Sequence, residues 1–179
     1  HPARGRYVSS HPMAGTEFSG PAAADGTLFN RKVAIICDSE SSDEDALQLV
    51  KALFSSFNMR LQFMNSADHD VHVAYVSHIS HITSFALALC VIDKEKDEKN
   101  ILSLAGGGFE STVRLSKSNG ETWAPIFLGN SESVLEVIDT YIAKMNLFRK
   151  YIGEKDAGAL KELMKSANAV TRILNHTEN

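Results

Sequence analysis

A histidine beside a rigid turn of small residues is the first part of this sequence that could do chemistry. His11 is followed by Pro12, by Ala14 and Gly15, and then by Glu17. Histidine titrates near neutral pH and can exchange a proton with a substrate, while proline fixes the backbone and glycine lets another group approach closely. A tight turn after a strand would account for the proline and the glycine, but not for His11 together with Glu17. The segment therefore predicts a cleft in which His11 acts as an acid or base.

A second group of polar side chains lies in the most apolar part of the chain. At about 100° per residue, a helix from Ser66 to Ile92 is apolar around most of its circumference. One narrow stripe of small or polar residues interrupts it, with His78 at its border: Asp70, Ala74, Ser77, His81, Ser84 and Ala88. A buried polar group without a partner costs about 1–3 kcal/mol. These side chains therefore either bond back to carbonyls of their own helix or border a polar pocket that holds a ligand, and the stripe alone leaves both interpretations open.

Four histidines in this region raise the question of a metal site. His69 and His72 form one H-x-x-H pair, and His78 and His81 form another. On a regular helix the first pair points away from the second, and neither pair has a third ligand at metal-site spacing on its own face. The sequence therefore predicts no metal site.

The elements that must position these residues change in character near residue 65. Strands are predicted at Arg6–Ser10, Lys32–Cys37 and Met59–Met64, with an amphipathic helix after Ser41. This alternation indicates an α/β region over residues 1–65, as at the end of a parallel-sheet domain. Residues 66–179 are predicted to be all-α. The expected long helices run from Ser66 to about Ile92, from a capping box at Ser133 and Glu136 to Phe148, and from Lys155 to Leu174.

Composition and charge limit the partners and the cellular compartment that we expect for this chain. The chain has 179 residues, of which 44% are hydrophobic and 22% charged, and its net charge of −4 disfavours nucleic acid as a partner. Cys37 and Cys90 lie in apolar stretches, so we expect buried, reduced thiols in a cytoplasmic protein, with a disulfide between them as the alternative.

No signal peptide is predicted. No membrane span is predicted either, because polar residues interrupt the apolar stretch from His78 to Ile92. The first residue is His1 rather than Met, which suggests a piece of a longer protein.

Three motifs follow one another along the chain: HPMAGTEFSG at His11–Gly20, SHISH at Ser77–His81, and the triple glycine with Arg114 and Trp123 at Gly106–Trp123. Their order and spacing resemble those of the prephenate and arogenate dehydrogenases of tyrosine biosynthesis. The resemblance extends from Tyr7 to about Tyr151. It implies an α/β remnant of a Rossmann-type domain followed by an all-α helical dimerisation domain that supplies half of the substrate pocket. The implied reaction is oxidative decarboxylation of prephenate to 4-hydroxyphenylpyruvate, with reduction of NAD or NADP, in a cytoplasmic homodimer.

The resemblance also implies roles for single residues. His11 matches the catalytic histidine that accepts the substrate's hydroxyl proton, and Arg114 matches the arginine that binds a substrate carboxylate. The remaining matches are residues that line the substrate cleft: Glu17, Ser77, His81, Gly107 and Trp123. From the sequence pattern alone, Arg114 could equally be a solvent-exposed arginine on a helix, and Trp123 could equally be a core residue. The chain departs from the family pattern at Ser80, where members usually have proline, and at Ser111 and Val113, where an acid and a threonine are usual.

A dinucleotide-binding motif is missing from the sequence. No G-x-G-x-x-G follows a strand, so the cofactor-binding residues are expected upstream of His1, and this chain alone is not expected to transfer hydride. Two alternatives stay open. One is an arogenate dehydrogenase, which gives tyrosine directly. The other is a non-catalytic module for dimerisation and tyrosine sensing, in which Arg114 and His81 bind the inhibitor; the presence of His11 and Glu17 argues against a purely regulatory role.

Overall fold

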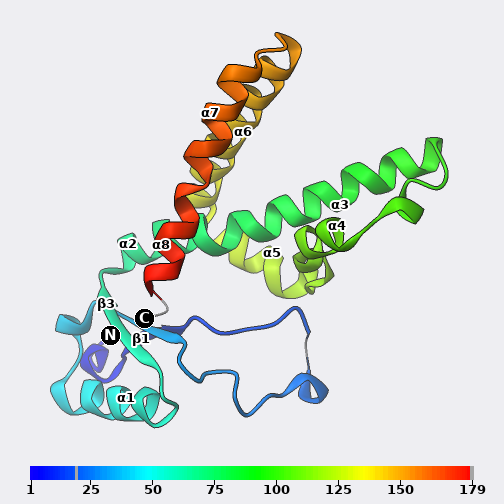
Figure 1. Cartoon of the computed structure of the whole chain (residues 1–179). Helices are drawn as coiled ribbons and strands as arrows, with labels where there is room; N and C mark the ends of the chain where they lie inside the picture. The colour runs from blue at the N-terminus through cyan, green and yellow to red at the C-terminus, as the bar shows by residue number, and fades with distance from the viewer. Residues whose placement is uncertain (19, 178–179) are drawn as a thin grey trace. The chain divides into compact units, whose positions relative to one another are not determined.

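The structure, a computed structural model, describes residues 1–18 and 20–177. It divides into two compact units, His1–Val134 and Leu135–Asn179. The first unit contains a small sheet and most of the helices, and the second is helical (Figure 1).

A three-stranded sheet forms the start of the first unit. Its strands lie in the order β1 (Ser9–Pro12), β2 (Val33–Cys37) and β3 (Arg60–Met64). β2 and β3 are parallel and are connected by helix α1 (Glu44–Ser56), whereas β1 is antiparallel to β2. The predicted strands at Lys32–Cys37 and Met59–Met64 are confirmed, whereas the strand predicted at Arg6–Ser10 is displaced along the chain to Ser9–Pro12 and contains His11, which pairs with Ile35. His11 therefore projects from the sheet itself and not from the loop that follows it.

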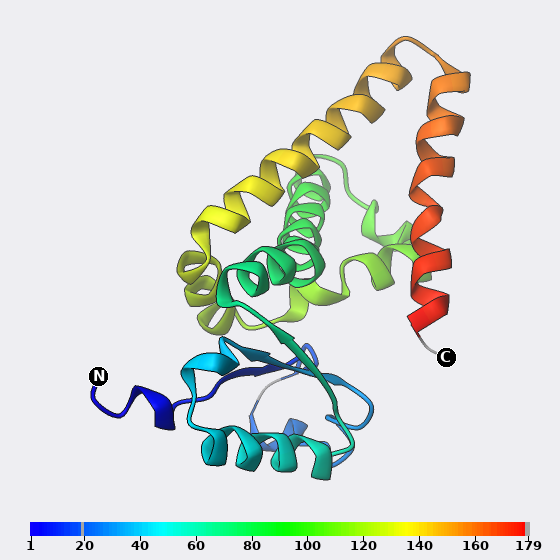
Figure 2. The ribbon, with the colours of Figure 1, turned by 90° about the vertical axis from the view of Figure 1, so that its left-hand side faces the viewer.

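Helix α1 covers one face of this sheet (Figure 2). The core between them contains Ala34, Phe54 and Met59, and partly buried side chains, including Val50 and Leu61, pack against it. These residues come from β2, α1 and β3, so burial of one apolar helix stripe holds the parallel pair together. The packed sheet therefore holds the backbone of His11 in a fixed position.

One long helical rod follows the sheet and carries the polar stripe. It consists of α2 (Ser66–Val73), a π-helical turn η4 (Ala74–His78) and α3 (Ile79–Asp97). Asn65 caps its start, because its side chain accepts a hydrogen bond from the backbone N–H of Asp68. Shorter elements follow: η5 (Leu102–Leu104), α4 (Gly107–Thr112), η6 (Arg114–Lys117) and α5 (Gly120–Gly129).

The rod is far less buried in the single chain than its apolar sequence predicts. Val76 is 68% exposed and Leu89 is 59% exposed. Cys90 is also exposed, contrary to prediction, while Cys37 is buried and both thiols are free, which excludes the disulfide between them. Ser66–Asp97 is long and apolar enough to cross a membrane by length and composition, although no span was predicted. The sequence estimate considered only His78–Ile92, whereas the continuous helix begins at Ser66 and offers a longer apolar window before the charged residues 93–97. A helix that packs inside a protein passes the same test.

A hydrogen bond from Ser84 joins the rod to the segment that precedes Arg114. The side chain of Ser84 is buried, and its hydroxyl donates a hydrogen bond to the backbone carbonyl of Thr112 at 3.1 Å. We expect Ser84→Ala to lower the free energy of unfolding by about 1 kcal/mol, because the carbonyl loses its buried donor. Urea unfolding followed by circular dichroism measures this. Ser80→Ala is the matched control, since the Ser80 hydroxyl contacts only its own helix, and an equal loss in both variants would contradict the assignment.

The second unit consists of helices with exposed apolar faces. α6 (Ser131–Gly153) starts at the end of the first unit and is followed by α7 (Ala157–Ala167) and α8 (Ala169–Thr177). α6 begins two residues before the predicted capping box, because the N–H of Val134 already bonds to the carbonyl of Asn130. The single helix predicted from Lys155 is in fact two helices, divided at Asn168. Large apolar side chains stay exposed along them, among them Ile142, Met145, Met164 and Ile173.

Candidate functional site

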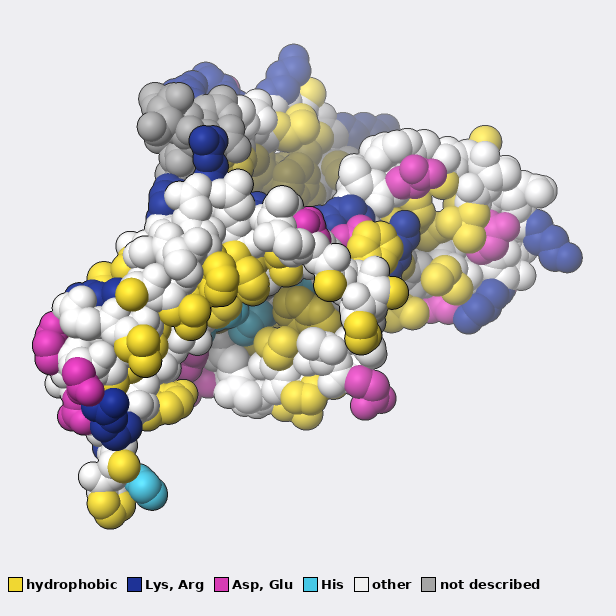
Figure 3. Space-filling model, turned by 90° about the horizontal axis from the view of Figure 1, so that it is seen from below, with side chains coloured by type: hydrophobic (Ala, Val, Ile, Leu, Met, Phe, Trp, Pro, Cys, Tyr) yellow, Lys and Arg dark blue, Asp and Glu magenta, His cyan; other side chains and the backbone are white. Residues whose placement is uncertain are grey.

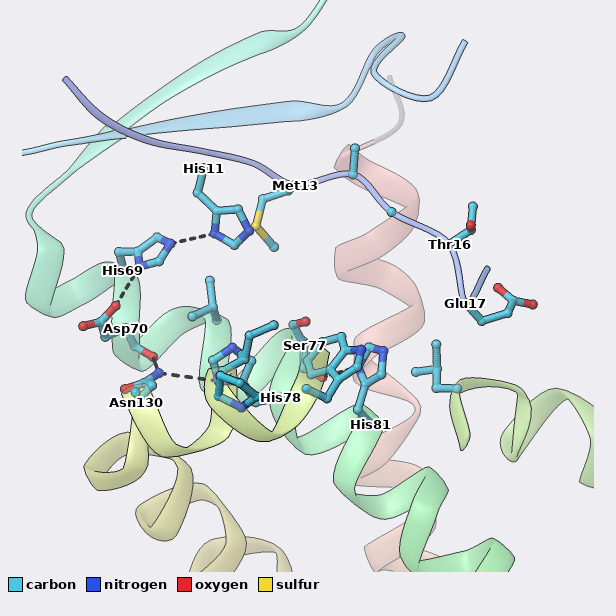
Figure 4. A pocket seen from close by; sticks show the side chains of 18 of the residues that line it. His11, Met13, Thr16, Glu17, His69, Asp70, Ser77, His78, His81 and Asn130 are labelled. Atoms are coloured by element: carbon cyan, nitrogen blue, oxygen red, sulfur yellow. Dashed lines mark hydrogen bonds and ion pairs between the residues drawn. The ribbon is translucent and has the colours of Figure 1, made fainter. Parts of the chain in front are cut away.

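A pocket of about 600 Å³ lies within the first unit. Three segments far apart in the sequence line it: His11–Glu17 at the end of β1, residues 69–81 of the rod, and residues 114–130 (Figure 4). From below, histidine side chains are visible, set back between hydrophobic ones (Figure 3). The pocket brings together six of the seven residues expected at the site: His11, Glu17, Ser77, His81, Arg114 and Trp123. Gly107, the first residue of α4, is not among the residues that line it.

The π-helical turn explains why histidines from both H-x-x-H pairs reach this pocket. On a regular helix His69 and His78 would point in opposite directions, at about 100° per residue. In η4 the N–H of Ile79 bonds to the carbonyl of Ala74, five residues back, so the turn takes in about one extra residue. This rotates the later residues by about 100°, which brings His69 onto the side of Ser77 and His81. The prediction that His69 points away was therefore wrong.

His11 belongs to a chain of three hydrogen-bonded side chains. Its Nδ1 lies 2.9 Å from Nε2 of His69, and Nδ1 of His69 lies 2.8 Å from a carboxylate oxygen of Asp70. The two rings meet edge to face, with centroids 5.1 Å apart. Sequence reasoning placed Asp70 in the polar stripe but gave it no role at the site, and it directed His69 away from the stripe; the H-D dipeptide they form was the available signal.

An aromatic wall forms another side of the pocket. The rings of His81 and Trp123 are stacked with centroids 3.4 Å apart, and His78 meets Trp123 edge to face. The Nδ1–H of His81 donates to the carbonyl of Ser77 at 3.1 Å, so Nε2 of a neutral His81 is left to accept a hydrogen bond. Both interpretations of the stripe therefore apply: His81 bonds back to its helix and also lines a polar pocket.

Arg114 and Glu17 form an ion pair in the pocket. A guanidinium nitrogen lies 2.5 Å from a carboxylate oxygen, and the side chain of Glu17 is only 12% exposed whereas that of Arg114 is 51% exposed. The backbone N–H of Glu17 and the nearby Arg114 lower the pKa of the Glu17 carboxyl. The arginine therefore has a negative partner and further N–H groups for another carboxylate.

The pocket favours neutral histidines. Burial, and then the neighbouring His69, lower the pKa of His11. Burial likewise lowers the pKa of His78, with further lowering by the surrounding histidines and an opposing effect of Asp70. The pKa of His81 is lowered by burial more than its bond to a backbone carbonyl raises it. Neutral imidazoles can accept protons, which suits a site for base catalysis.

These lowered pKa values predict how folding stability depends on pH. Below about pH 6.5 the unfolded chain binds more protons on these histidines than the folded chain does, so stability falls as the pH falls from about 7 to 5. Thermal unfolding at a series of pH values measures the effect. His78→Leu should flatten the dependence, while His72→Leu, on the exposed side of α2, should leave it unchanged. A midpoint that stays constant over this range would contradict the prediction.

Among the described residues, no group of three or more histidine, cysteine or acidic side chains is placed to hold a metal ion. The groups that the described pocket presents are imidazoles, a guanidinium and an aromatic wall.

Comparisons with known proteins agree with this combination of residues. The model of the prephenate dehydrogenase dimerization domain matches residues 65–166, and that of the prephenate dehydrogenase nucleotide-binding domain matches residues 1–63. A prephenate dehydrogenase of Bacillus subtilis is 30% identical over 166 residues, which are 93% of this chain and 45% of the relative. A cyclohexadienyl dehydrogenase of Zymomonas mobilis is 29% identical over 161 residues, covering 89% of this chain and 55% of the relative.

Solved structures agree as well. The prephenate dehydrogenase of Aquifex aeolicus, in complex with hydroxyphenyl propionate and NAD+, matches with a TM-score of 0.86 and 29% identity, over 95% of this chain and 59% of that one. An arogenate dehydrogenase of Synechocystis shares the fold, with a TM-score of 0.75 and 23% identity, over 94% of this chain and 61% of that one. The chain spans about half the length of the curated relatives it matches. By its matched domains and its pocket, the chain belongs to the prephenate dehydrogenase family.

Proposed function

We propose that this chain supplies the substrate site of an NAD-dependent prephenate dehydrogenase, which converts prephenate to 4-hydroxyphenylpyruvate and carbon dioxide. The observation that carries the proposal is the placement of His11 and Arg114, from β1 and η6, around one pocket in a chain of this family. The relative from Aquifex aeolicus, with its bound hydroxyphenyl propionate and NAD+, supports the same chemistry.

His11 acts as the base. Its Nε2 takes the proton of the ring hydroxyl while a hydride leaves the carbon that bears this hydroxyl. The bond between the ring and its carboxylate then breaks, carbon dioxide departs, and the electron pair of that bond makes the ring aromatic. The oxygen, now a phenolate, takes the proton back from His11. Neutral His11 is thus restored at the end of each turnover.

Arg114 and the aromatic wall hold the substrate. The guanidinium can bind two oxygens of a substrate carboxylate at once, and its pairing with Glu17 keeps it directed at the pocket. The face of His81 and Trp123 offers a flat apolar surface for the ring, and Nε2 of His81 offers an acceptor. The base and the carboxylate-binding group then orient the substrate from two sides.

NAD accepts the hydride when it is bound. Among the described residues, the pocket around His11 is where the reactive end of this cofactor would have to lie, because the carbon that loses hydride must lie beside His11. Within the described residues, the run Gly106–Gly108 follows the 3-10 turn η5 and not a strand, so it does not form a pyrophosphate cradle. The strand–helix–strand unit of β2, α1 and β3 is the kind of unit from which a Rossmann-type domain is built, and we infer that it is part of one.

The exposed apolar faces of the helices support a homodimer. The matched family domain is a dimerization domain, and α3, α6, α7 and α8 leave large apolar side chains uncovered in the single chain. Sedimentation equilibrium of the protein tests this, and a monomer at all concentrations would reject it.

The experiment that tests the function is an assay of the full-length gene product that contains this chain. Reduced-nicotinamide absorbance is followed with prephenate and with arogenate, which carries an amino group in place of the keto oxygen, each with NAD and NADP. We expect turnover of prephenate with NAD. Turnover of arogenate alone would reassign the enzyme as an arogenate dehydrogenase, and no turnover of either would reject the proposal. Addition of tyrosine to the same assay shows whether the product's amino acid inhibits the enzyme.

A further inference from the structure

We propose that His69 and Asp70 are positioning residues that determine which nitrogen of His11 carries its proton. The inference rests on the proposed function for its catalytic meaning, because it concerns the base of that reaction. The proton arrangement itself can be measured without any turnover.

The direction of the hydrogen bonds follows from the chemistry of the three side chains. An ionised carboxylate can only accept, so Nδ1 of His69 must carry a hydrogen toward Asp70. Nε2 of a neutral His69 is then without a hydrogen and acts as an acceptor. His11 must therefore donate from Nδ1, and its Nε2 keeps a lone pair for the substrate's hydroxyl proton.

The surroundings hold this chain of side chains in place. His11 lies on β1 and His69 on α2, so their bond joins the sheet to the rod across 58 positions of sequence. The side chain of His69 is only 17% exposed. The carbonyl of Asp70 accepts a hydrogen bond of 2.7 Å from the side-chain amide of Asn130, which fixes the start of the rod against the end of α5. Figure 4 shows His69 between His11 and Asp70.

The arrangement matters because only one form of neutral His11 is competent. With the hydrogen on Nε2, His11 could not accept a proton at that atom and would have its free lone pair on the side of His69. Among the described residues, the charged and titratable groups in the pocket around His11 are His69 and Asp70 from α2, His78 from the π-helical turn, His81 from α3, Glu17 from the segment after β1, and Arg114 from η6. Of these, only His69 is within hydrogen-bond distance of the His11 ring.

Nuclear magnetic resonance of the histidine ring nitrogens tests the proton arrangement on the 179-residue chain. We expect His11 in the Nδ1–H form. His69→Leu removes the acceptor and should shift His11 mainly to the Nε2–H form, while His69→Gln offers an amide oxygen and should retain much of the Nδ1–H form. His72→Leu, on the same helix but outside the pocket, is the matched control. An Nε2–H form of His11 in the unaltered chain, or no change in His69→Leu, would overturn the proposal.

Kinetics of the full-length protein test the consequence for catalysis. His69→Leu should lower kcat by about 10- to 100-fold, the usual effect of losing a group that orients a functional histidine, with little change in KM. Partial recovery in His69→Gln is expected, whereas a merely structural role would not distinguish the two variants. If His69→Leu does not fold, Asp70→Asn replaces it, since this carboxylate is half exposed and its loss should weaken the preference for the Nδ1–H form. A shifted tautomer in a protein without dehydrogenase activity would reject the function but keep the positioning chain; unchanged kcat in an active enzyme would reject the positioning role alone.

Discussion

Replacement of His11 by asparagine is expected to lower kcat for prephenate by about 10²- to 10⁴-fold, the usual contribution of a positioned general base. The asparagine amide can occupy the place of Nδ1 and still donate to His69, so the strand and the pocket should keep their geometry. It has no atom equivalent to Nε2, and the hydroxyl proton therefore has no acceptor. KM should change little, because substrate binding relies mainly on Arg114 and the aromatic wall.

The pH profile gives the sharper measurement for this variant. In the unaltered enzyme kcat/KM should fall on the acidic side as His11 becomes protonated, and the lowered pKa of His11 moves this loss below the usual histidine range. The acidic limb should disappear in His11→Asn. His72→Asn is the control, since that histidine lies outside the pocket. A variant with normal kcat would remove His11 from the mechanism.

Replacement of Arg114 by glutamine is expected to weaken substrate binding by about 10- to 100-fold, because a charge-assisted hydrogen bond contributes about 1.5–3 kcal/mol. Calorimetric titration with a hydroxyphenyl propionate, the kind of ligand held by the Aquifex aeolicus relative, measures this on the protein. Lys117→Gln removes the same charge from the same short helix but outside the pocket, where it acts only weakly on Glu17, and should have a much smaller effect. Equal losses in both variants would show that general charge, and not Arg114, binds the ligand.

Part of the loss of ligand affinity expected in Arg114→Gln depends on the charge of Glu17. Without Arg114 its carboxylate would stay in the pocket unpaired and would repel the carboxylate of the ligand. Arg114→Gln combined with Glu17→Gln should therefore bind more tightly than Arg114→Gln alone. The double-mutant cycle yields the coupling between the two residues, and strict additivity would show that the ion pair does not act on the ligand.

Much of the site could be predicted from the sequence because its residues lie in short motifs. His11, Glu17, Ser77, His81, Arg114 and Trp123 were expected and meet in one pocket. The strands were predictable for a similar reason: a short run of β-branched residues, as in Lys32–Cys37, indicates a strand without knowledge of the rest of the fold.

Two features could not be predicted from local sequence patterns: the direction of His69 and the exposure of α3. A projection at constant pitch placed His69 on the wrong side of the rod, because nothing in Ala74–His78 indicates a π-helical turn. The apolar content of α3 predicted burial, whereas Leu89 and Cys90 are exposed in the single chain, because local pattern does not say which surface covers a helix.

The widened turn at Ala74–His78 also determines which change in length the rod can absorb. Loss of one codon there would restore an ordinary helix without altering its composition or its apolar character. Because the π-helical turn holds about one residue more than an ordinary turn, side chains beyond such a deletion would keep their direction relative to His69. An inserted residue in an ordinary turn between His69 and His81 would instead rotate the later side chains by about 100°. We therefore expect a one-residue deletion within Ala74–His78 to be tolerated during evolution, while insertions should be confined to the loops on either side of the rod.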